Sequence, residues 1–142
     1  ASDVPAHLPG IRAWREAMPA PNLPEPLPLD VNVDPWPVAA YDAVFSANTA
    51  HIMSWPEVEK LFARIDAALA PHGRLCLYGP FNYGGRFTAP SNAAFDASLR
   101  SRDPRMGLRD FEAVDGLARH CGLALVADHA MPANNRLLEW RR

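Results

Sequence analysis

The stretch that decides the fold is Tyr41–Ile52, which reads YDAVFSANTAHI. Its first half carries the small and apolar residues of a buried strand, and its second half becomes polar at Asn48, Thr49 and His51. In open α/β sheets, ligands bind outside the carboxyl ends of the strands. A strand that ends in Asn48 and His51 therefore predicts a binding or catalytic site at that edge of a sheet.

Helices and strands alternate after this stretch. Ser54 and Glu57 have the spacing of a capping box, and apolar residues at i, i+3 and i+4 predict a helix over Trp55–Ala70. The other expected elements are strands at Arg74–Tyr78, Leu123–Ala127 and Arg136–Trp140, and helices at Ser91–Arg100 and Asp110–Cys121. This alternation predicts βαβ units and a mainly parallel sheet, to which the last two strands add one antiparallel member.

Proline dominates the first quarter of the chain, where nine of the 15 prolines lie before residue 38. We expect a proline-rich head over residues 1–38, with a short helix at Ile11–Met18 and a short strand at Leu27–Val31. An α/β core then follows over residues 39–142. The length of 142 residues is typical of a single domain.

The composition argues against several classes of function. The net charge of -2 gives no basic footprint for nucleic acid. No apolar run approaches the roughly 18 residues that span a membrane, and no signal peptide is recognisable, so we expect a cytoplasmic protein. Cys76 and Cys121 form no CxxC pair and are expected to be reduced, packed thiols. No His, Cys and carboxylate residues have the spacing of metal ligands, so no metal is proposed.

Four segments resemble the methyltransferase-like protein 26 family, formerly a domain of unknown function. They are FSANTAHIMSWPEVEKLF (Phe45–Phe62), LYGPFNYGGRFTAPSNAAFD (Leu77–Asp96), SRDPRMGLRD (Ser101–Asp110) and MPANN (Met131–Asn135). The resemblance covers nearly the whole chain. It implies the Rossmann-like fold of class I methyltransferases, with S-adenosylmethionine as the cofactor and Tyr41–Ala47 as the fourth strand.

The resemblance also implies that part of the fold is absent. Class I methyltransferases hold the cofactor on a glycine-rich loop after the first strand, but Gly10 is the one glycine before residue 73 here. We therefore expect an N-terminally truncated fold that begins at the tail of the second strand. Leu27–Val31 is then left without a neighbour and Tyr41–Ala47 becomes an edge strand. Because a bare central strand favours association, we expect a homo-oligomer that forms through the Tyr41–Ala47 edge.

His51 and Tyr78 are the catalytic candidates. A neutral histidine acts as a general base near pH 7, although a lone histidine also serves to cap a helix or to pack. Tyr78 ends the Arg74–Tyr78 strand, and together with Gly79, Pro80 and Phe81 it would form an apolar, hydroxyl-bearing wall of a substrate pocket. A tight turn from strand to loop is the alternative for the segment from Tyr78 to Phe81.

The resemblance implies three cofactor-binding residues. Asn48 lies on the loop that borders cofactor and substrate in the family. Asp30 corresponds to the acidic residue that accepts the adenine amino group, with a turn-forming role as the alternative. Asp3 corresponds to the acid that holds the ribose hydroxyls.

Three further residues are candidates for substrate binding. Arg109 belongs to a charged segment that is either a solvated surface or a site for an anionic group. Asn134 and Asn135 are either turn residues or part of the same crevice at the carboxyl edge of the sheet.

The expected function is that of the C-terminal portion of an S-adenosylmethionine-dependent methyltransferase. Such an enzyme positions a small acceptor in line with the sulfonium methyl group. The acceptor is unknown, and the chain alone is expected to be inactive. The alternative is a non-catalytic remnant, or a homodimeric interaction domain, that has lost cofactor binding.

Overall fold

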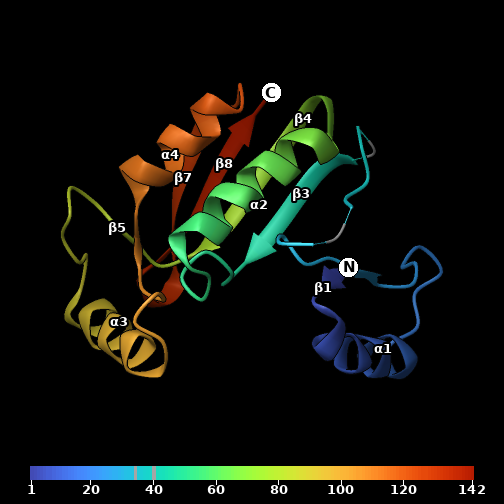
Figure 1. Cartoon of the computed structure of the whole chain (residues 1–142), viewed down its shortest axis with the longest axis horizontal. Coiled ribbons are helices and arrows are strands. Elements are labelled where there is room, and N and C mark those ends of the chain that lie inside the picture. The colour runs from blue at the N-terminus through green and yellow to red at the C-terminus, as the bar shows by residue number, and fades with distance from the viewer. Residues whose placement is uncertain (34, 40) are drawn as a thin grey trace. The chain divides into compact units, whose positions relative to one another are not determined.

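The computed structural model of the chain describes residues 1–33, 35–39 and 41–142. These residues form two compact units, Ala1–Trp36 and Pro37–Arg142 (Figure 1). The sequence placed the boundary between head and core after residue 38, close to the division after Trp36. No helix in the described part of the chain has the length and apolar character needed to cross a bilayer.

The first unit is small, and its first strand pairs with its last strand. It contains β1 (Ser2–Asp3), a 3₁₀ turn (Pro5–His7), α1 (Leu8–Ala17) and β2 (Leu27–Pro28). β1 and β2 are parallel, with Ser2 opposite Leu27. The expectation that the strand at Leu27–Val31 has no neighbour is therefore wrong. The strand is also shorter than expected, ending at Pro28, a residue without a backbone donor for the ladder.

The second unit is built on a four-stranded sheet. Its strands are β3 (Tyr41–Ala47), β4 (Leu69–Gly79), β8 (Asn135–Arg141) and β7 (Ala124–Met131), in that spatial order. β3 and β4 are parallel, whereas β8 is antiparallel to both β4 and β7. The sheet is therefore mixed rather than mainly parallel, because the single reversed strand lies between two others and takes part in two of the three pairings.

The α-helices among the described residues of this unit are α2 (Trp55–Ala68), α3 (Pro90–Arg102) and α4 (Phe111–His120). The capping box of α2 is confirmed, and the backbone N–H of Ser54 donates to Glu57 Oε2 over 2.7 Å. α3 begins one residue before the expected start at Ser91, with Ala89 at the N-cap position and Pro90 as the first helical residue. Proline suits that position since the first N–H of a helix has no partner within it.

The core lies where α2 and α4 cover one face of the sheet (Figure 1). Fully buried side chains from the helices and strands include Val58, Phe62, Ile65, Leu75, Val114, Leu138 and Trp140. The rings of Phe62 and Trp140 meet edge-on, with centroids 6.3 Å apart. The Trp140 indole N–H donates to Asp115 Oδ1 over 2.9 Å, so this buried donor has a partner.

Two features of this unit bear on function. The first is that β3 is an edge strand of the sheet, which among the described residues pairs with β4 alone. Its residue Phe45 is 66% exposed. The sequence did not predict the second feature, a parallel pair formed by β5 (Phe81–Asn82) and β6 (Arg109–Asp110). This pair brings the segment before α4 next to the chain that leaves β4.

Candidate functional site

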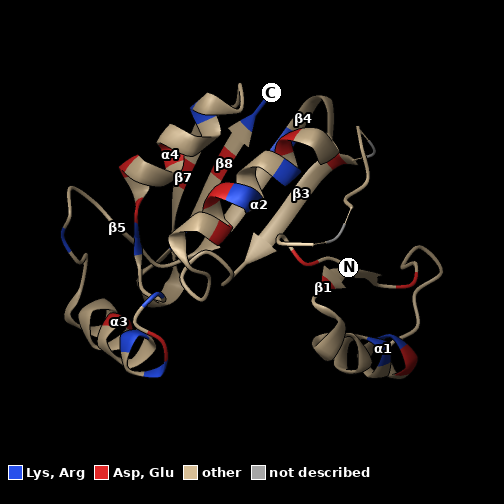
Figure 2. Ribbon diagram, viewed as in Figure 1, with Lys and Arg blue, Asp and Glu red and all other residues tan. Residues whose placement is uncertain are grey.

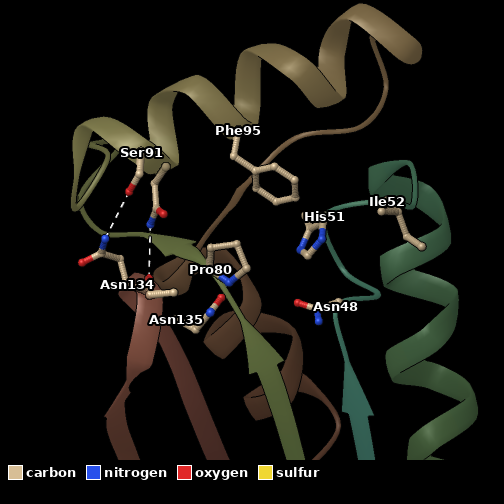
Figure 3. A pocket seen from close by; sticks show the side chains of 10 residues that line it. Asn48, His51, Ile52, Pro80, Ser91, Phe95, Asn134 and Asn135 are labelled. Carbon is tan, nitrogen blue, oxygen red and sulfur yellow. Dashed lines mark hydrogen bonds between the residues drawn. The ribbon is translucent and has the colours of Figure 1, made fainter.

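A cavity of about 720 Å³ lies at the carboxyl ends of β3 and β4, the sheet edge that the sequence indicated (Figure 3). The ends of these strands and the loop after β3 form one side, while α3 and the turn between β7 and β8 form the other. The residues that line it are Asn48, His51, Ile52, Pro80, Ser91, Asn92, Phe95, Ala133, Asn134 and Asn135.

The lining is polar but carries little charge. None of the described residues around the cavity is Lys, Arg, Asp or Glu. Amide and hydroxyl groups come from the asparagines and Ser91, and apolar surface comes from Ile52, Pro80 and Phe95. The charged residues lie elsewhere, with acidic and basic side chains interspersed along α2 and α3 (Figure 2). The cavity is therefore suited to a ligand that forms hydrogen bonds but bears no net charge.

His51 is the titratable group of the cavity. Its side chain lies between Phe95 and Asn48 (Figure 3), the residue is 5% exposed, and its ring meets that of Phe95 edge-on at 5.2 Å. Burial, and then the positive charge of Arg109, lower the pKa of His51 to about 4. The imidazole is thus neutral at pH 7. No hydrogen bond from the described residues occupies its ring nitrogens, so they are available to a ligand.

Asn48 and Gly79 shape the floor of the cavity. Asn48 has a φ of 58°, a conformation that asparagine tolerates, and its N–H donates to the carbonyl of Tyr78 over 2.8 Å. A Cβ atom at Gly79 would lie 3.6 Å from His51 Nδ1 and 3.7 Å from Asn48 Oδ1. The glycine therefore leaves open the space between the two strand ends.

Hydrogen bonds tie the turn between β7 and β8 to the start of α3 (Figure 3). Asn134 Nδ2 donates to Ser91 Oγ over 3.1 Å, and Asn92 Nδ2 donates to the carbonyl of Asn134 over 3.3 Å and to Thr88 Oγ1 over 2.9 Å. Ala133 and Asn134 both have positive φ values, of 57° and 58°. These bonds hold a strained turn against the helix and fix that wall of the cavity.

The structure brings four of the nine predicted site residues to the cavity: Asn48, His51, Asn134 and Asn135. Tyr78 is half-buried within β4 and does not line it. Phe81 is 2% exposed and also lies outside the lining, because its backbone pairs with Arg109 in the β5–β6 ladder. Of the segment from Tyr78 to Phe81 that was expected to form a pocket wall, Pro80 lines the cavity.

Arg109 has a different place from the one expected for an anion-binding residue. Its guanidinium donates to the carbonyl oxygens of Ala50 over 3.1 Å, of Arg105 over 2.9 Å, and of Met53. The side chain does not line the cavity. Backbone carbonyls from two separate segments thus take up the donors that an anionic ligand would need.

Asp3 and Asp30 lie in the first unit, where local contacts engage both carboxylates. Asp3 Oδ1 accepts the N–H of Val4 over 2.7 Å and lies 3.0 Å from His7 Nδ1. Asp30 Oδ1 accepts the N–H of Asn32 over 2.8 Å, which agrees with the turn-forming alternative.

Residues of metal-ligating types and two cysteines are also among the described residues. Within residues 1–33, 35–39 and 41–142, no group of three His, Cys, Asp or Glu side chains is placed to hold a metal ion. Cys76 and Cys121 are free and half-buried, and burial raises the pKa of both thiols.

Sequence reasoning missed the α3 wall of the cavity. The residue pattern predicted a helix that begins at Ser91, but none of Ser91, Asn92 and Phe95 was predicted to line a site. A signal was nevertheless present, because a polar pair at a helix start followed by an aromatic residue one turn later puts all three on the same end of the helix.

The fold is similar to that of solved methyltransferase structures. The chain superposes on an O-methyltransferase family protein from Burkholderia thailandensis with a TM-score of 0.84 and 19% identity, covering 99% of this chain and 42% of that one. An O-methyltransferase family 2 protein from Planctomyces limnophilus, solved as a complex with apigenin, gives a TM-score of 0.85 and 22% identity over 99% and 42% of the two chains.

A human protein has the same fold. N-acetylserotonin methyltransferase, solved in complex with SAM, matches with a TM-score of 0.80 and 14% identity, covering 99% of this chain and 39% of that chain. This chain therefore spans about two fifths of the length of the solved structures that it matches.

The family assignment is direct. Residues 1–142 match the family described as "Protein of unknown function (DUF938)", and the chain belongs to that family.

Proposed function

We propose that residues 37–142 form the acceptor-binding part of an S-adenosylmethionine-dependent methyltransferase. The observation that carries this proposal is the cavity at the carboxyl ends of β3 and β4, which holds a buried, neutral His51 in a methyltransferase-like fold. The resemblance to methyltransferase-like protein 26 and a cytoplasmic location belong to the same proposal. S-adenosylmethionine supplies the methyl group when it is bound to the whole protein.

The lining of the cavity supports an uncharged small molecule as the acceptor. An ionised group would lose its hydration without meeting a counter-charge, because the described lining holds none of Lys, Arg, Asp or Glu. The volume of about 720 Å³ lies within the range of small-molecule sites. Phe95 and Pro80 offer apolar surface to a planar ring, while Asn48 and Asn134 offer amide groups to its polar substituents.

His51 is the residue that we place at the reacting hydroxyl of the acceptor. The neutral imidazole accepts the hydroxyl hydrogen bond and takes up the proton as the oxygen acquires the methyl group. Because its pKa is lowered to about 4, His51 is a weak base. It therefore suits a phenolic hydroxyl, which loses its proton readily, better than an aliphatic alcohol.

The test uses the full-length protein that contains this chain. It is incubated with S-adenosylmethionine and either 4-methylphenol or 4-methylbenzoate, and methylated product is measured by mass spectrometry. We expect product from the phenol alone, and a loss of about 100-fold or more in rate in His51→Ala. His120→Ala, which changes an exposed histidine at the end of α4, is the matched control. Equal rates in the two variants would refute the role of His51.

A specific observation also favours a second candidate function, a homodimeric interaction domain without catalysis. β3 ends the described sheet and exposes Phe45, so its free edge offers backbone groups to a second copy. Light scattering on the chain separates this candidate from the first: a dimer that Phe45→Lys dissociates supports it, whereas a stable monomer at all concentrations counts against it. Calorimetric binding of S-adenosylmethionine by the chain would also count against a remnant that has lost cofactor binding.

A further inference from the structure

The position of His51 depends on the loop that carries it. Its ring contacts Phe95 but forms no hydrogen bond with the described residues, so side-chain contacts alone do not fix its orientation. The loop from Asn48 to Ser54 contains little internal bonding, with one bond from the N–H of Ile52 to the carbonyl of Thr49 over 3.1 Å. Something outside the loop must therefore hold it in place.

The segment that begins β6 supplies those contacts. Arg109 donates to the carbonyls of Ala50 and Met53, and the N–H of Gly107 donates to the carbonyl of His51 over 2.9 Å. Three of four successive carbonyls, those of residues 50, 51 and 53, thus accept hydrogen bonds from residues 107–109. The guanidinium is planar and rigid, so it fixes the spacing between the two carbonyls that it binds.

This segment is itself anchored to α3. Asp96 Oδ1 accepts the N–H of Leu108 over 2.7 Å, and Asp96 Oδ2 accepts Arg100 Nε over 2.7 Å. Gly107 leaves no room for a side chain, since a Cβ atom there would lie 2.5 Å from Arg100 Nη2 and 2.8 Å from Asp96 Oδ1. The chain of contacts runs from α3, which forms one wall of the cavity, to the loop that bears His51 on the opposite wall.

Arg109 also acts on His51 through its charge. It is the ionised side chain whose field lowers the pKa of the imidazole, after burial itself. Nearby carboxylates also have other partners: Asp96 pairs with Arg100, and Asp103 pairs with Arg105. Glu57 accepts hydrogen bonds from the backbone and hydroxyl of Ser54. The further charged residues of α3 and β6 are Arg102 and Asp110. The positive charge of Arg109 faces carbonyl oxygens rather than a carboxylate partner.

We infer that Arg109 is a positioning residue for His51, which holds the loop so that the imidazole faces the cavity. The inference deepens the proposed function and rests on it for the role of His51. It gives Arg109 a role other than anion binding, since the guanidinium binds backbone carbonyls and does not line the cavity.

The test is an NMR titration of the His51 ring in the chain without cofactor or acceptor. In Arg109→Gln, which removes the positive charge and the planar guanidinium, we expect the pKa of His51 to rise toward 6.5 without reaching it, because burial remains. Arg109→Lys keeps the charge but not the two-carbonyl geometry, and should give an intermediate pKa. Arg102→Gln, at the exposed end of α3, is the matched control and should leave the pKa unchanged. An unchanged pKa in a folded Arg109→Gln variant would overturn the inference.

A second readout covers the case in which Arg109→Gln does not fold. In Arg109→Lys, we expect hydrogen exchange at the Gly107 amide to quicken about tenfold or more as the loop loosens; unaltered exchange together with an unaltered pKa would contradict the inference. The two proposals fail separately. A shifted His51 pKa with no methyl transfer by the full-length protein defeats the proposed function alone, whereas methyl transfer that needs His51 with no effect of Arg109 on its pKa defeats this inference alone.

Discussion

The imidazole of His51 meets the ring of Phe95 edge-on, with centroids 5.2 Å apart and ring planes inclined at 75°. The two residues come from the β3–α2 loop and from α3, so the contact spans the cavity from one wall to the other (Figure 3). It excludes water from one side of the imidazole and contributes to the burial that keeps the ring neutral. The chemistry proposed for the cavity depends on this neutral state.

The neutral state of His51 makes stability depend on pH. Its pKa is about 4 in the folded chain and 6.5 when unfolded, so between these values the unfolded state binds a proton that the folded state does not. Stability is full above pH 6.5 and falls by roughly 3 kcal/mol as the pH approaches 4. Urea unfolding should show this loss in the native chain and a smaller loss in His51→Asn. Equal losses in both would show that His51 is not buried neutral.

Replacement by alanine at two glycines should change the stability of the chain in opposite directions. Gly107 has a φ of 143° and no space for a methyl group, so Gly107→Ala should destabilise the chain by about 1–3 kcal/mol. Gly116 lies inside α4, and no atom lies within 4 Å of the place that an added methyl group would take, so Gly116→Ala should stabilise by about 0.4–1 kcal/mol. Thermal unfolding of both variants checks the pair. A neutral Gly107→Ala would mean that the α3–β6 segment packs less tightly than these distances require.

The buried bond between Trp140 and Asp115 should contribute measurably to stability. Asp115→Ala leaves the indole N–H without its acceptor and removes the ion pair with Arg119, which should cost about 1–3 kcal/mol. Asp115→Asn keeps an acceptor oxygen for Trp140 and should cost less. Denaturant unfolding measures both, and the Trp140 indole proton in the NMR spectrum reports the bond. Equal costs would assign the effect to the Arg119 pair alone.

Asn134 should matter for binding more than for stability. Asn134→Gly removes the amide that donates to Ser91 while suiting the positive φ of 58°, so unfolding free energy should change by less than about 1 kcal/mol. Affinity for 4-methylphenol should fall about fivefold, because one hydrogen-bonding group of the lining is lost. NMR titration measures the affinity. Unaltered affinity would remove Asn134 from the acceptor site.

The sequence predicted the part of the site that depends on local pattern. The strand Tyr41–Ala47 with its polar end, the capping box of Ser54 and Glu57, and the two C-terminal strands could all be predicted from residue spacing. The placement of Arg109 could not be predicted, because its carbonyl partners at Ala50 and Met53 are more than fifty residues away in the sequence. Every residue type has a backbone carbonyl, so residue identity does not indicate which carbonyl accepts the bond.

The mixed sheet escaped prediction for a similar reason. The last two strands were correctly expected to be antiparallel, but local spacing does not say on which side a strand inserts. β8 lies between β4 and β7, so its Leu138 and Trp140 belong to the centre of the core and not to an edge. The β5–β6 pair is two residues long on each side, too short to produce a period in the sequence.

The most direct test of the account is NMR mapping of matched probes on the isotopically labelled chain. 4-Methylphenol and 4-methylbenzoate share a ring and differ in charge. Comparing their binding therefore tests whether the cavity binds an uncharged hydroxyl compound. We predict that the phenol shifts the signals of Asn48, His51, Phe95 and Asn134 in a saturable way and that the benzoate does not. Tighter binding of the benzoate, or phenol shifts confined to another surface, would contradict the assignment of this cavity as the acceptor site.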